Sequence, residues 1–184
     1  MRRIAVRTDD FRLSFHLMRE LKRRKCEFVM LSSNDEWEGI LLTSPEEVRG
    51  GEIPAMEENI EIAVERAIQA SRGLDTAVQL VFGVDPGPRP GLAWLADGIV
   101  IGTAQLENIG MVADHIIGLS TAVKHQRMCV KIGDGAPLIR DRIINQLILR
   151  GIETLQVNEY RTSSGSRSKA HIHAATRIAL MSGL

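Results

Sequence analysis

Apolar and polar positions in the first 76 residues change between strand and helix periods, which predicts a small α/β unit. The strands expected from short apolar or alternating runs span residues 3–8, 28–32 and 39–43. The helices expected from spacings of three and four span residues 11–25 and 56–71. In the first helix we expect one stripe to face the core, made of Phe11, Phe15, Met18 and Leu21. This half shows no set of side chains typical of a catalytic site.

From Val78 onward the chain is more apolar, and a second set of elements is predicted. Strands are expected over residues 78–84, 92–96, 99–105, 127–132 and 152–160. Helices are expected over residues 108–125, 136–150 and 168–181. Asp97-Gly98, between the second and third strands, is typical of a tight hairpin turn. We therefore expect two domains, residues 1–76 and residues 77–184.

The apolar strand at 78–84 ends abruptly in Asp85, Pro86 and Gly87. Proline and glycine favour a turn here. A carboxylate at the end of a buried strand is costly unless a partner compensates its charge, and a metal ion or a phosphate-bearing ligand is such a partner. The same pattern is typical of an aspartate that only ends a strand or forms a turn. These residues alone leave both interpretations open.

The composition is that of an ordinary globular protein, with 44% apolar and 25% charged residues. No apolar run is long enough for a membrane helix, and residues 1–7 lack the apolar stretch of a signal peptide. The two cysteines have no metal-ligand spacing, so we expect reduced thiols in a cytoplasmic protein. A net charge of zero argues mildly against bulk nucleic-acid binding. The balance is uneven: residues 1–76 carry 12 basic and 15 acidic side chains, a net of −3, and residues 77–184 carry 11 and 8, a net of +3, so we expect the second half rather than the first to meet a polyanion.

Four segments of the second half, taken in order, resemble the ribonuclease H-like superfamily. They are residues 82–87, 91–93, 129–134 and 168–175. Within the superfamily, the sequence is most similar to RuvC-type Holliday-junction resolvases and the small predicted nucleases related to them. The resemblance implies an α/β fold with a mixed sheet, three antiparallel strands followed by two parallel strands with helices. It covers residues 77–184 and does not extend to the small α/β unit before them.

The resemblance also implies a site for a divalent metal ion. Asp85 and Asp134 fall where the family places carboxylates at strand ends, and His171 falls where the last helix places an acidic or histidine ligand. Carboxylate oxygens suit Mg²⁺ or Mn²⁺, and such an ion can activate water for attack on a phosphodiester. Ala174 departs from the pattern, because the family has a further aspartate there. Asp134 lies between two glycines, which is also typical of an ordinary loop before a helix.

The last predicted helix carries two histidines, and the helix period separates them. His171 and His173 are about 200° apart around the helix axis. The face expected to be buried contains Ala175, Ile178 and Ala179. His171 shares that face and His173 does not, so we expect His171 to act as a metal ligand or general base. The alternative is a hydrogen-bonded core histidine without a catalytic role.

Cationic residues near these positions are candidates for phosphate contacts. They are Arg89, Arg161, Arg167 and Lys169. The last three lie in a hydroxyl-rich segment that leads into a helix N-terminus, although a solvated linker would have the same composition. Aromatic residues are few and not clustered in the sequence, so base stacking on aromatic side chains is not indicated.

We therefore expect a Mg²⁺- or Mn²⁺-dependent nuclease that hydrolyses phosphodiesters in structured nucleic acid, such as junction DNA. Resolvases cut paired strands as dimers, so symmetric cleavage would require a homodimer. One alternative is a non-catalytic binding or scaffold protein with the same fold, which the alanine at position 174 allows. The other is a nucleotide-binding protein of actin-like type, which normally needs two such domains. No membrane partner is expected.

Overall fold

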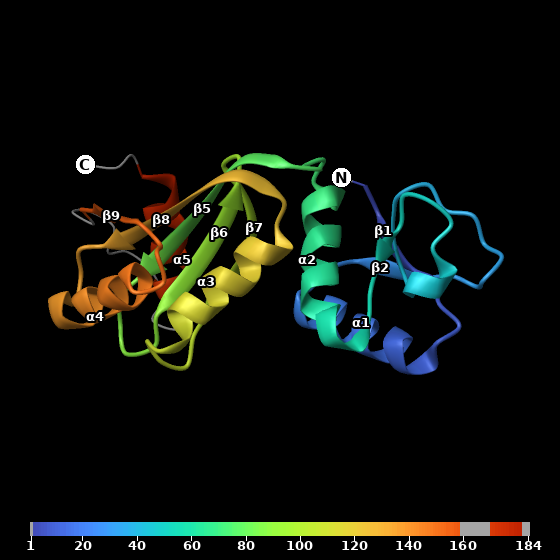
Figure 1. Cartoon of the computed structure of the whole chain (residues 1–184), viewed down its shortest axis with the longest axis horizontal. Coiled ribbons are helices and arrows are strands. Elements are labelled where there is room, and N and C mark those ends of the chain that lie inside the picture. The colour runs from blue at the N-terminus through green and yellow to red at the C-terminus, as the bar shows by residue number, and fades with distance from the viewer. Residues whose placement is uncertain (1, 159–169, 182–184) are drawn as a thin grey trace. The chain divides into compact units, whose positions relative to one another are not determined.

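The computed structural model describes residues 2–158 and 170–181, which form a mixed α/β structure with two sheets and five α-helices (Figure 1). These elements belong to two compact units. The first consists of residues 1–76 and 121–124, and the second of residues 77–120 and 125–184. Independent folding of the two expected domains stays a prediction. None of the described helices is long and apolar enough to span a membrane.

The sheet of the first unit is parallel throughout, with strand order β2-β1-β3-β4. Its strands are β1 (Ile4–Val6), β2 (Phe28–Met30), β3 (Ile40–Thr43) and β4 (Ile53–Pro54). Its helices are α1 (Phe11–Arg23) and α2 (Ile60–Ser71), with short 3₁₀ turns η1 (Pro45–Glu47) and η2 (Glu57–Asn59). Every residue of β1 and β3 is buried, so these two strands form the centre of the unit.

Helix α1 begins where the sequence predicts but turns a different face to the core. Asp10 caps the helix by accepting hydrogen bonds from the backbone N–H groups of Arg12 and Leu13. The buried apolar residues are Leu13, Leu17 and Leu21. The expected core positions of Phe11 and Phe15 are wrong, because these residues are 92% and 53% exposed. Two apolar stripes run along this helix, and periodicity alone does not determine which of them meets the sheet.

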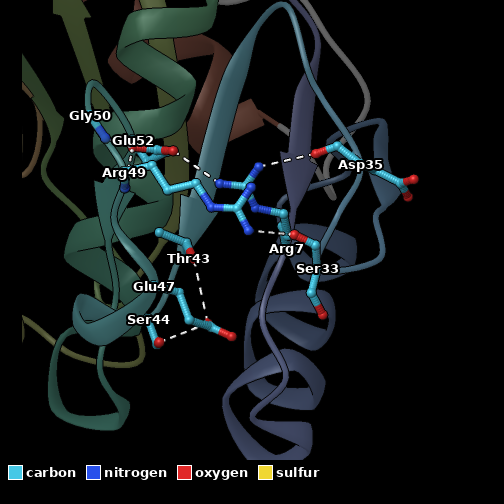
Figure 2. Close-up of polar contacts among 9 residues, drawn as sticks. All are labelled: Arg7, Ser33, Asp35, Thr43, Ser44, Glu47, Arg49, Gly50 and Glu52. Atoms are coloured by element: carbon cyan, nitrogen blue, oxygen red, sulfur yellow. Dashed lines mark hydrogen bonds and ion pairs between the residues drawn. The ribbon is translucent and has the colours of Figure 1, made fainter.

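A network of charged side chains joins the carboxyl end of β1 to the loops around it (Figure 2). Glu52 accepts hydrogen bonds from the Arg7 guanidinium, at 3.0 Å, and from the backbone N–H groups of Arg49 and Gly50. The Arg7 and Glu52 side chains are nearly shielded from solvent. Arg49 donates in turn to the carbonyl oxygen of Ser33. The loops before β3 and β4 are therefore held over the end of β1.

The sheet of the second unit is mixed, with strand order β7-β6-β5-β8-β9. Its strands are β5 (Ala77–Asp85), β6 (Gly91–Ala96), β7 (Ile99–Gln105), β8 (His125–Gly133) and β9 (Thr154–Val157). The β5–β6 and β6–β7 pairs are antiparallel, whereas β8 runs parallel to β5 and β9 runs parallel to β8. β5 is therefore the central strand, with neighbours of both directions.

Helices cover both faces of this sheet (Figure 1). They are α3 (Met111–Ala122), α4 (Pro137–Ile148) and α5 (Ala170–Leu180). α5 packs closely on β5 and β6, and its buried residues are those expected from the sequence, Ala175, Ile178 and Ala179. The approach is close because Gly83 has no side chain: a Cβ there would stand 2.7 Å from the backbone nitrogen of Ala179. The backbone of α5 is thus held directly against the central strand.

Candidate functional site

Asp85 is the last residue of β5 and lies at the carboxyl end of the central strand. Gly91 of β6 is its antiparallel partner on one side, and β8 runs along the other side. Asp85 is only 8% exposed. Burial raises the pKa of its carboxyl above the usual range, while the hydrogen bond from His171 and the charge of Arg177 partly oppose this shift. The ionised form of Asp85 is therefore stabilised at this buried position by His171 and Arg177.

Helix α5 brings His171 to this carboxyl. The Nδ1 atom of His171 lies 2.6 Å from Oδ2 of Asp85, within hydrogen-bond distance. The side chain of Asp85 is 12% exposed and that of His171 is 42% exposed, so the pair joins a buried carboxyl to a ring that solvent reaches. His173 is exposed, as the helix period predicts. The structure thus brings together Asp85 and His171 and leaves His173 outside this contact.

Two glycines make room for the histidine. A Cβ at Gly91 would overlap the carbonyl oxygen of His171 and stand 3.1 Å from its Cβ atom. A Cβ at Gly87 would stand 3.4 Å from Cε1 of the imidazole ring. The sequence indicates that Gly87 belongs to a turn. Nothing in the local sequence around Gly87 or Gly91 indicates that both glycines contact a helix some 80 residues later.

The geometry of the pair determines what the imidazole can do. When Asp85 is a carboxylate it can only accept a hydrogen bond, so Nδ1 of His171 is the donor. In a neutral ring, Nε2 then carries a lone pair and can accept a proton or bind a cation. Asp85 thereby fixes both the tautomer and the orientation of the ring. The same arrangement prepares a histidine for general-base catalysis in hydrolases.

Asp134 follows β8 at the same end of the sheet. The parallel register of β5 and β8 pairs Val84 with Ile132, one residue before Asp85, and Asp134 lies in the bend just after Gly133, the last residue of β8. Arg140 donates a hydrogen bond to the backbone carbonyl oxygen of Asp134 at 3.3 Å. Within the described part of the chain, no three His, Cys, Asp or Glu side chains form a group that could hold a metal ion. Joint metal binding by Asp85, Asp134 and His171 stays a prediction.

Of the four cationic residues predicted to contact phosphate, the described part of the chain contains only Arg89. Arg89 is exposed and forms an ion pair with Glu107, with 3.2 Å between Nη2 and Oε1. Arg89 lies in the loop after β5, and Glu107 lies in the loop after β7. Phosphate binding by Arg89 stays a prediction. Arg161, Arg167 and Lys169 lie outside the described residues.

Comparison with known proteins does not assign the chain to a family. No family model matches it, and no curated protein matches its sequence. Among solved structures, the chain is similar to the Argonaute of Marinitoga piezophila, crystallised in complex with a 5′-OH guide RNA. The identity is 10% and the TM-score is 0.33, and the match spans 85% of this chain and 39% of the Argonaute chain. A likeness this distant carries no argument about fold or function.

Proposed function

We propose that the second unit is a ribonuclease H-like nuclease that hydrolyses phosphodiesters in structured nucleic acid. The strand order β7-β6-β5-β8-β9, with three antiparallel strands followed by two parallel ones, supports this proposal. The position of Asp85 supports it too, because open α/β sheets gather their functional groups beyond the carboxyl ends of the strands. The observation that carries the proposal is the 2.6 Å contact between Asp85 and His171.

In this proposal the two side chains act as one unit. Asp85 accepts the hydrogen bond from Nδ1 of His171 and keeps Nε2 free to remove a proton from the attacking water. The Asp85 carboxylate then stabilises the imidazolium that forms. A positioned general base of this kind contributes about 10²–10⁴-fold to a rate.

The donors present also fit a hard divalent cation held by few protein ligands. Asp85 and Asp134 would supply carboxylate oxygens, and Mg²⁺ commonly binds one or two carboxylates together with waters and substrate phosphates. With Nδ1 of His171 held by Asp85, Nε2 points away from that carboxylate, so it would serve either as the general base or, in place of that role, as a nitrogen ligand, which suits Mn²⁺ better than Mg²⁺. Such an ion supplies charge neutralisation for the phosphate and a more acidic bound water.

The proposal is tested by incubating the full chain with junction, duplex, hybrid and single-stranded substrates in Mg²⁺ or Mn²⁺. We expect metal-dependent cleavage of a branched substrate, with Mn²⁺ more effective than Mg²⁺, and loss of cleavage in Asp85→Asn. Symmetric cutting of a junction would also require two copies of the chain. If none of the substrates is cut with either ion, the nuclease proposal fails.

Two observations favour a second candidate, a nucleic-acid-binding protein without catalysis. Ala174 cannot provide the carboxylate that the resemblance implies one turn after the start of the last helix, and the described residues contain no group of three metal-ligating side chains. This candidate predicts that a junction binds to the wild type and to Asp85→Asn alike and is cut by neither. The same incubations therefore separate the two functions.

A further inference from the structure

The outer face of α1 presents two phenylalanines to solvent. Phe11 is 92% exposed and Phe15 is 53% exposed, although the whole chain contains only four phenylalanines. They lie one turn apart on the same side of the helix. The centre of this side is about 140° around the axis from the buried stripe of Leu13, Leu17 and Leu21. Packing within the unit therefore does not account for either ring.

Cationic side chains accompany these rings. Arg19 and Lys22 are exposed and lie on the same side of α1 as Phe11 and Phe15. The Arg19 guanidinium lies 5.9 Å from the centre of the Phe15 ring, within the range of a cation–π contact. In the parts of the chain that the structure describes, neither Arg19 nor Lys22 forms an ion pair with a carboxylate.

Other charged side chains of α1 form ion pairs within the first unit. Arg12 pairs with Glu57 at 3.2 Å, and Arg23 pairs with Glu20 at 2.6 Å. Glu20 is the only acidic residue of α1, and it is buried. The exposed outer face therefore combines apolar rings with positive charge and carries no negative charge of its own.

We propose that this face of α1, made of Phe11, Phe15, Arg19 and Lys22, binds single-stranded nucleic acid. Exposed aromatic rings beside cations are the combination by which proteins hold single strands, with bases stacked on the rings and phosphates paired with the cations. Residues 1–76 carry 12 basic and 15 acidic side chains, a net of −3, so the complementarity to a phosphate backbone is local to this face, where Arg19 and Lys22 lie together. An apolar peptide or a lipid surface would use a broader apolar stripe, whereas here only Met18, half-buried, adds to the two rings.

This inference deepens the proposed function, because it names the form of nucleic acid that the first unit holds. The inference takes from the proposed function only the assumption that the ligand is a nucleic acid. Binding by α1 involves no residue of the Asp85–His171 pair, so the two proposals can fail separately. A single-stranded arm or end of a branched substrate would be the segment that this face holds.

The test measures binding of the full chain to labelled 12-nucleotide oligo-dT and oligo-U by fluorescence anisotropy, in EDTA so that metal-dependent cleavage does not interfere. In the Phe11→Ala/Phe15→Ala variant we expect Kd to rise by roughly ten-fold for each ring removed. Phe11→Trp/Phe15→Trp should keep wild-type affinity or improve it, whereas the leucine pair should bind as weakly as the alanine pair. In Arg19→Gln/Lys22→Gln the slope of log K against log salt should become shallower by about 1.4, the value for two phosphate contacts on a single strand.

The matched control is Leu138→Ala/Leu149→Ala, which removes two apolar side chains that are 82% and 85% exposed at the two ends of α4. It should leave Kd unchanged. Unchanged melting temperatures would show that the variants fold, as expected for exposed rings.

Equal Kd values for wild type and the Phe11→Ala/Phe15→Ala variant would overturn the inference. So would a loss of self-association, or of binding to anionic vesicles, in that variant without any change in oligonucleotide binding. Binding that depends on Phe11 and Phe15, together with no cleavage of any of the four substrates in Mg²⁺ or Mn²⁺, would sustain this inference and reject the nuclease.

Discussion

Gly91, the first residue of β6, lies so close to His171 that any side chain at position 91 would overlap the His171 carbonyl oxygen. The start of α5 is therefore positioned by contact between two backbones. The imidazole reaches Asp85 because the helix bearing it is seated on this glycine and on Gly83. The site thus depends on two glycines that carry no chemistry themselves.

Gly91→Ala should disturb the site without altering any catalytic group. The added Cβ forces α5 away from the sheet, and overpacking of this kind costs about 1–3 kcal/mol. We expect a lower melting temperature and slower cleavage, measured on the same preparation. Gly118→Ala is the matched control, because a Cβ at that position in α3 meets no atom within 4 Å. It should be neutral or slightly stabilising, since alanine favours a helix more than glycine does.

The buried Asp85 should make stability depend on pH in a defined direction. Its pKa is raised in the folded state by burial, so its contribution is fully present below the ordinary aspartate pKa and is lost as pH rises through the folded value. In Asp85→Asn this dependence is absent. The unfolding free energy of the variant should therefore rise relative to wild type between about pH 4 and neutrality. Urea denaturation at several pH values measures the difference, and parallel profiles would contradict the shifted pKa.

Glu47, whose carboxyl accepts hydrogen bonds from Thr43 and Ser44 (Figure 2), should stabilise the first unit in the opposite pH range. Burial alone would raise the pKa of its carboxyl, but hydrogen bonds from Thr8, the Asp9 backbone and Ser44 lower it to about 2. Its contribution is present above the ordinary pKa and is lost as pH falls toward about 2. After allowance for solvent screening, Glu47→Gln should cost about 1 kcal/mol at pH 7.

The control for this prediction is Glu46→Gln on the exposed side of η1, which should leave the unfolding free energy unchanged at pH 7. Acid titration of the unfolding free energy would show the effect. An equal loss of stability below pH 4 in wild type and in Glu47→Gln would show that Glu47 is not held as a carboxylate.

Divalent cations should stabilise the protein if Asp85 and Asp134 bind one together. A ligand that binds only the folded state adds RT ln(1 + [L]/Kd), about 2.7 kcal/mol at one hundred times Kd. We expect Mn²⁺ to raise the melting temperature of wild type and to have no such effect on Asp85→Asn. An unchanged wild-type melting temperature across millimolar Mn²⁺ and Mg²⁺ would count against the metal site.

The sequence predicts much of the second unit because its strands are continuous apolar runs bounded by glycine, proline and aspartate. The expected strand at 99–105 coincides with β7, and the expected strand at 78–84 differs from β5 by one residue at each end. The expected strand at 152–160 begins two residues before β9, which spans Thr154–Val157, and its last two residues lie outside the described part of the chain. His171 rather than His173 meets Asp85 because helix geometry alone separates the two side chains.

Long-range packing explains what the sequence does not predict. Phe11 and Phe15 follow the same period as Leu13 and Leu17, so only the sheet decides which stripe is buried. The Arg7–Glu52 ion pair joins residues 45 positions apart, which meet because the parallel register pairs Val6 with Leu42 and Leu42 with Ile53, the residue after Glu52. No local pattern marks either feature.

The rate of Mn²⁺-dependent cleavage of a branched DNA by His171→Ala and by His173→Ala tests the central claim most directly. The two histidines lie two residues apart on α5, but only His171 contacts Asp85. We predict a loss of about 10²-fold or more for His171→Ala and a change within about two-fold for His173→Ala. Equal rates for the two variants would contradict the account.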